Sequence, residues 1–172
     1  MGLPWKEFAV GCNCSDSFYG TFQADIRALD SYGCSRVREY GTHMQIGDII
    51  FMKSIDRVHI TTNEEGQKSD YKMFENYGDV ILYHPYGDEG STPIIHRAMY
   101  RVEAGEPMWE GGPPAPYSGY ITKGDNVVTN QHFDQEGQIS YLMPVKDDWV
   151  IGTAQYRIPY LGYIRLLFSR II

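Results

Sequence analysis

The chain has 172 residues, which is about one domain by length, and it carries a net charge of -7 with an isoelectric point near 5.1. No block of Lys and Arg is long enough to follow a phosphate backbone, so nucleic acid is not expected as a partner. Glycine (18), tyrosine (14) and proline (9) are frequent. Because helical periodicity is scarce, the composition predicts a mainly β protein.

The three cysteines, Cys12, Cys14 and Cys34, have neither CxxC nor zinc-knuckle spacing. We therefore expect no disulfide framework and no metal site. No cofactor is expected either. No run of about 18 apolar residues marks a membrane span. The nearest stretch is "IPYLGYIRLLFSRII" (158–172), which is apolar and aromatic but contains two arginines. It fits either a last core strand with a tail or a surface that meets a membrane.

Turn residues divide the middle of the chain into short elements. "GDIIFMK" (47–53) and "GDVILYHP" (78–85) are Gly-Asp turns followed by β-branched runs, which predicts two core strands. The polar stretch between them is expected to be an excursion from the sheet. It could form a hairpin, and a turn is expected at Gly66. A longer strand is expected over 91–104, and the Pro/Gly-rich segment 105–119 is expected to be a loop.

Three further strands are expected in the last third of the chain, over 120–129, 137–145 and 148–160. Three ionisable residues lie beside these turns or strand ends: His96, Asp125 and Asp134. Taken singly, a strand histidine is more often a core residue than a base, and an aspartate after glycine is more often a turn residue. A histidine backed by a carboxylate can, however, activate a hydroxyl nucleophile, because the acid fixes the imidazole tautomer and stabilises its cation.

Four short motifs, "GDII", "IIHR", "GYITKGDN" and "DQ", follow one another in this order. With the later "RIPYLGYIRLLF", they make residues 43–168 resemble the type I signal peptidases of the archaeal and endoplasmic-reticulum kind. The resemblance implies a β-rich catalytic domain, normally preceded by a membrane helix. It also implies that His96 is the general base and that Asp125 or Asp134 completes the triad.

The serine nucleophile that this family requires is missing. The family serine stands in a motif like "SGSMEP", and counting back from His43 places it at Glu39. Glutamate cannot replace it. Ser35 and Thr42 are the nearest hydroxyls, but neither is followed by the Met-x-Pro of the motif.

A shift of reading frame before His43 would account for the missing motif. Codons shifted by one base across residues 35–43 can spell "VESGSMEP", and residues 9–22 can become an apolar run suited to a membrane helix. Codon degeneracy permits this reading without requiring it. The alternative is a true variant that has lost its nucleophile.

These observations divide the chain into three parts. Residues 1–42 form an aberrant segment, residues 43–160 a signal-peptidase-like catalytic domain, and residues 161–172 an apolar membrane-proximal tail. The resemblance implies a serine endopeptidase at the cell membrane, with its catalytic domain on the extracytoplasmic face. The intact gene product would cleave preproteins that bear signal peptides and bind them as an added strand, whereas the given chain, which lacks the serine, is expected to be inactive.

Two other functions stay open. An inactive homologue would bind extended peptides or partner subunits through the same groove, and a genuine glutamate at position 39 favours it. A self-cleaving repressor-type β domain is a third reading. The absence of a DNA-binding helix pair and the aromatic C-terminal stretch count against that reading. The sequence does not identify membrane subunits.

Overall fold

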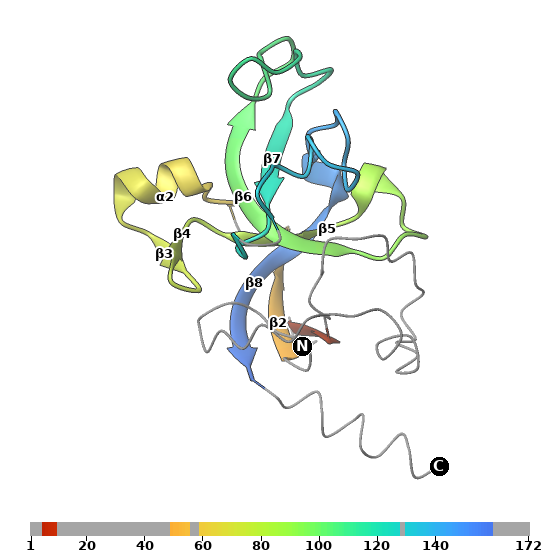
Figure 1. The fold of residues 1–172 in the computed structure, drawn as a ribbon. Coiled ribbons are helices and arrows are strands. Elements are labelled where there is room, and N and C mark those ends of the chain that lie inside the picture. The colour runs from red at the N-terminus through yellow and green to blue at the C-terminus, as the bar shows by residue number, and fades with distance from the viewer. Residues whose placement is uncertain (1–4, 10–48, 56–58, 128–129, 160–172) are drawn as a thin grey trace.

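The computed structural model describes residues 5–9, 49–55, 59–127 and 130–159 (Figure 1). Six strands form one antiparallel sheet in the order β1-β2-β8-β5-β6-β7. In chain order these strands are β1 (Trp5–Ala9), β2 (Ile49–Ser54), β5 (Val80–Tyr83), β6 (Ile94–Val102), β7 (Gly119–Lys123) and β8 (Val150–Ile158). The prediction of a mainly β fold is confirmed.

The central strand β5 is buried on both faces, which explains its unbroken apolar sequence "VILY". Side chains alternate between the two faces of a strand. Ile81 and Tyr83 accordingly pack in one core cluster with Ala98 of β6, while Val80 and Leu82 pack in a second cluster. A third cluster lies under the long loop between β6 and β7.

The register of β6 decides where its two polar residues point. His96 pairs with Ile81 of β5, and Arg97 pairs with Val80. Opposite residues of an antiparallel pair share a face, so His96 lies on the Ile81 face and Arg97 on the other. Two consecutive residues therefore serve opposite sides of the sheet.

The polar excursion between β2 and β5 contains a helix that the sequence reading missed. The helix α2 (Asn63–Ser69) is followed by a small hairpin of β3 (Lys72–Met73) and β4 (Asn76–Tyr77), so a hairpin is present. The prediction of a turn at Gly66 is wrong, because this glycine lies within α2. A Cβ atom at Gly66 would come within 2.5 Å of the backbone nitrogen of Gly78, so the residue permits close packing of the helix.

The chain after β7 also differs from the expectation. The strand predicted over 120–129 ends at Lys123, and the segment 137–145 forms turns instead of a strand. Leu142 has a φ of 56°, outside the extended region. Only Val145 pairs with the sheet, as an isolated bridge in which it exchanges two hydrogen bonds of 2.8 Å with Tyr120.

The loop expected over 105–119 agrees with the sequence reading, while two 3-10 helices were not predicted. The loop over 105–119 contains no helix or strand before β7 begins, and Figure 1 shows it joining the far ends of β6 and β7. Two short 3-10 helices, η2 (Pro85–Gly87) and η3 (Asp147–Trp149), lie beside each other.

Several expectations concern residues outside the described ranges. These are the expected serine position Glu39, the segment 1–42 proposed to be read out of frame (except β1), and the apolar tail over 161–172. Within the segment 1–42, β1 pairs with β2 so that Trp5 stands opposite Lys53 and Ala9 opposite Ile49. In the described part of the chain, every helix is too short or too polar to cross a membrane.

Candidate functional site

His96 and Asp134 form a buried pair. The Nδ1 atom of His96 lies 2.8 Å from Oδ2 and 2.9 Å from Oδ1 of Asp134. Both side chains are almost completely buried, at 5% and 3% exposure. β6 supplies the histidine, and the loop after β7 supplies the aspartate, whose backbone N–H donates to the Thr122 carbonyl at 2.9 Å.

Two hydroxyl groups also donate to the Asp134 carboxylate. The Thr122 hydroxyl lies 2.6 Å and the Tyr83 hydroxyl 2.8 Å from Oδ2. Thr122 stands opposite Ala98 in the β6–β7 register, and therefore on the same sheet face as His96. The alternation along β5, β6 and β7 thus brings these three side chains to one point.

The pair stabilises its own charges. Burial by itself lowers the pKa of His96, but the negative charge and hydrogen bond of Asp134 outweigh it, and the pKa stands above its ordinary value. Burial raises the pKa of Asp134, yet the His96 charge and the three hydrogen bonds lower it below its ordinary value. The carboxylate therefore favours the imidazolium cation that forms when this histidine accepts a proton.

Asp125 makes a different pair. Its Oδ1 and Oδ2 atoms accept hydrogen bonds of 2.7 and 2.6 Å from Nε and Nη2 of Arg97, which is 2% exposed. The same guanidinium also donates to four backbone carbonyls of the excursion, at Met73, Asn76, Tyr77 and Gly78. Asp125 acts on His96 only through its charge, as the smallest influence on the pKa of that residue.

The structure thus brings together His96 and Asp134 and places Asp125 with Arg97. A histidine that donates Nδ1–H to a carboxylate presents the lone pair of Nε2, which can take a proton from a hydroxyl nucleophile. Sequence reasoning did not select Tyr83 or Thr122. Their signal was available only through strand register, which an unaligned sequence does not reveal.

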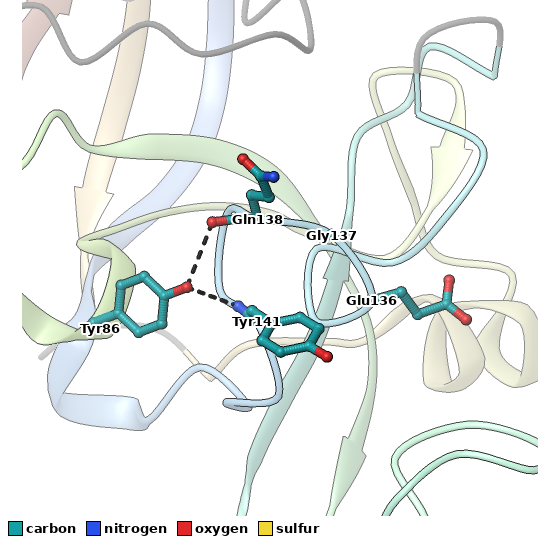
Figure 2. Close-up of a pocket in the computed structure, with 5 residues that line it drawn as sticks. All are labelled: Tyr86, Glu136, Gly137, Gln138 and Tyr141. Atoms are coloured by element: carbon teal, nitrogen blue, oxygen red, sulfur yellow. Dashed lines mark hydrogen bonds between the residues drawn. The ribbon is translucent and has the colours of Figure 1, made fainter.

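The surface hollow beside this loop does not include the pair. It has a volume of about 470 Å³ and is lined by Tyr86, Glu136, Gly137, Gln138 and Tyr141. Figure 2 shows the Tyr86 hydroxyl between two points of the loop: it donates to the Gln138 carbonyl at 3.4 Å and accepts from the Tyr141 backbone N–H at 2.9 Å. Tyr86 thereby ties the loop that carries Asp134 to the end of β5.

The described residues contain no group of three or more His, Cys, Asp or Glu side chains placed to hold a metal ion. The side chains that lie together at the described site are a histidine, a carboxylate and two hydroxyl donors.

No family model matches the chain. Over 127 residues, which are 73% of this chain, it is 30% identical to the signal peptidase complex catalytic subunit SEC11 of Eremothecium gossypii. The match covers 58% of that protein, so the chain spans less than two thirds of its length. This similarity supports a relationship to the type I signal peptidases over the matched part of the chain.

Proposed function

We propose that the chain carries the catalytic domain of a signal-peptidase-like serine endopeptidase. The observation that supports it most is the buried contact of 2.8 Å between His96 and Asp134, in a chain related to signal peptidases. In this proposal His96 is the general base and Asp134 its orienting acid. Asp125 holds Arg97 in the framework and takes no direct part in the chemistry.

The proposed reaction follows from the direction of the imidazole. Asp134 accepts from Nδ1–H, so Nε2 takes the proton from a serine hydroxyl as its oxygen attacks the peptide carbonyl. The imidazolium formed in this step is stabilised by the carboxylate. It then returns the proton to the leaving amine, and water hydrolyses the acyl-enzyme with His96 again as base.

The proposed substrates are preproteins that bear signal peptides, bound as an added strand. The proposed location is the cell membrane, with the domain on the extracytoplasmic face and with the lipid bilayer as a neighbour. The serine is proposed to come from a restored reading frame, at the position where Glu39 stands in the printed chain. An inactive peptide-binding homologue is the second candidate. The observation in its favour is the glutamate at position 39 of the sequence.

The first measurement is the genomic DNA from about 150 bases upstream of the His43 codon. If an extra base opens a frame that spells an apolar helix followed by "SMEP", the proposal holds at the level of the gene. If the bases confirm Glu39 in frame, the peptidase proposal fails and the binding homologue replaces it.

The second measurement is cleavage of a preprotein, with the cut position read by mass spectrometry. The form with the serine motif restored should cleave after the signal peptide, and His96→Ala and Asp134→Asn should remove this activity. His132→Ala is the matched control, because His132 also pairs with a carboxylate, Glu136 at 3.2 Å, but is 75% exposed. Equal activity in His96→Ala and His132→Ala would contradict the role of His96.

A further inference from the structure

We propose that Tyr83 and Thr122 are positioning residues that hold the Asp134 carboxylate in line with Nδ1 of His96. This assignment rests on the proposed function for its catalytic meaning. Its geometry rests only on the contacts described above. Three adjacent strands contribute: Tyr83 from β5, His96 from β6 and Thr122 from β7.

Gln135 determines the direction in which the Thr122 hydroxyl donates. The backbone N–H of Thr122 donates to Oε1 of Gln135 at 3.0 Å, which fixes the orientation of the side-chain amide. Its Nε2 group must then donate to the Thr122 hydroxyl oxygen, at 3.2 Å. That oxygen accepts from Gln135, and its hydrogen is donated to Oδ2 of Asp134 at 2.6 Å, because an ionised carboxylate can only accept.

Tyr83 is suited to be a permanent donor. Its side chain is fully buried, and burial together with the charge of Asp134 raises the pKa of its hydroxyl well above the ordinary value. The hydroxyl therefore stays protonated and donates to Oδ2 at 2.8 Å. The further ionisable groups whose charge reaches these residues are Asp125, which acts on His96, and Tyr86, which acts on Tyr83.

These bonds have a geometric consequence. A carboxylate on a loop can rotate about its own side-chain bonds, and a small displacement from the histidine weakens proton transfer. Two hydroxyls on sheet strands oppose this rotation, and Gln135, the next residue, is fixed to the same strand as Thr122. The rigid sheet thus determines the position of a carboxylate that the loop alone would leave adjustable.

The test follows the ring nitrogens of His96 by 15N NMR across a pH titration, in the full chain. This measurement needs no enzymatic activity. Tyr83→Phe and Thr122→Val each remove one hydroxyl and keep the size of the side chain. Tyr71→Phe is the matched control, because Tyr71 also donates to an aspartate, Asp79 at 2.9 Å, away from the site. Thr122→Ser keeps the hydroxyl and should restore the behaviour of the original chain.

We expect Tyr83→Phe and Thr122→Val each to lower the titration midpoint of His96 by about half a pKa unit. A carboxylate that is no longer held against Nδ1 stabilises the imidazolium less. The midpoint should stay in place in Tyr71→Phe and Thr122→Ser. An unchanged midpoint in Tyr83→Phe would overturn the proposal, as would an equal shift in Tyr71→Phe.

The result is separable from that of the proposed function. If the midpoints move and no form of the chain cleaves a preprotein, the positioning role stands and the peptidase fails. In a serine-containing form that cleaves, Tyr83→Phe should lower kcat by about tenfold and leave KM unchanged, since the hydroxyl does not contact the substrate.

Discussion

Two neighbouring residues of β6 each meet an aspartate, and the two pairs are built differently. His96 and Asp134 lie on one sheet face, where the carboxylate is surrounded by hydroxyl donors. Arg97 and Asp125 lie on the other face, where the guanidinium is surrounded by backbone carbonyls. The first pair contains a group that can lose its proton near neutral pH, and the second does not.

This difference separates two tasks that the sequence places side by side. Arg97 carries a permanent charge and joins the excursion between β2 and β5 to the sheet. His96 carries a charge that depends on its carboxylate, which makes it the one suited to accept and release a proton. The predictions below test whether the two tasks are as separate as the geometry indicates.

The largest effect is expected from Arg97→Met. It leaves Asp125 without its partner and four carbonyls without their donor, so the free energy of unfolding should fall by about 3–5 kcal/mol. Urea denaturation measures it. Arg101→Met is the control, because Arg101 also bonds a carboxylate, Asp147 at 3.0 Å, but is 38% exposed and should cost less than about 1 kcal/mol. Equal losses of unfolding free energy in Arg97→Met and Arg101→Met would show that the buried guanidinium does not contribute more to stability than the exposed one.

Asp134→Asn should cost about 2–3 kcal/mol, and the cost should depend on pH. The raised pKa of His96 stabilises the fold fully below about pH 6.5, and this contribution is lost as the pH rises through the pKa of His96 in the folded protein. The lowered pKa of Asp134 stabilises the fold fully above about pH 4, and this contribution is lost as the pH falls through the folded pKa of Asp134. The difference between the two proteins should therefore be greatest between about pH 4 and 6.5.

Urea denaturation at pH 5 and pH 8 measures this dependence. The pair of His132, which is 75% exposed, and Glu136 provides the control: Glu136→Gln should show no comparable change between the two pH values. A cost of Asp134→Asn that is the same at pH 5 and pH 8 would contradict the charged pair.

Asp125→Asn should have a smaller effect, about 1–2 kcal/mol, because the amide oxygen still accepts one bond from Arg97. The His96 titration, followed by NMR, should move down slightly, since the Asp125 charge raises the pKa of that residue only as its weakest influence. A shift as large as that in Asp134→Asn would instead make Asp125 the partner of the histidine.

The smallest effect is expected from Tyr86→Phe, at about 0.5–1 kcal/mol. Loss of the hydroxyl frees the Tyr141 backbone N–H, whose hydrogen exchange should become faster. Tyr141→Phe is the control, since the hydroxyl of Tyr141 takes no part in this bridge. Unchanged exchange at Tyr141 in Tyr86→Phe would show that the loop is held by its other contacts.

Sequence reasoning was most successful where turn and strand signals agreed. The Gly-Asp turns and β-branched runs predicted β2 and β5, and the histidine motif predicted β6. It missed α2, because a glycine and several polar residues hide the helical pattern. A usable signal was present: Thr62 and Glu65 form a capping box, in which each side chain bonds the other's backbone N–H.

The remaining errors arose where tertiary contacts decide the structure. The segment 137–145 is apolar enough to suggest a strand, but Ile139, Leu142 and Val145 join two core clusters from turns. The same limit left the choice between Asp125 and Asp134 open. That choice depends on how the chain returns to β7 after Lys123, and spacing alone does not determine this path.

The loop after β7, which folds back along this strand, also covers the edge of the sheet. The outward N–H and C=O groups of Tyr120 bond Val145, and those of Thr122 bond Gln135 and the Asp134 backbone. An exposed edge strand invites pairing with a second molecule and thereby aggregation. Here a strand could add at these positions only by displacing the loop that carries Asp134. Self-association through this edge and an intact His96–Asp134 pair are therefore mutually exclusive. A preparation that forms edge-paired aggregates should also lose the contact between His96 and the Asp134 carboxylate.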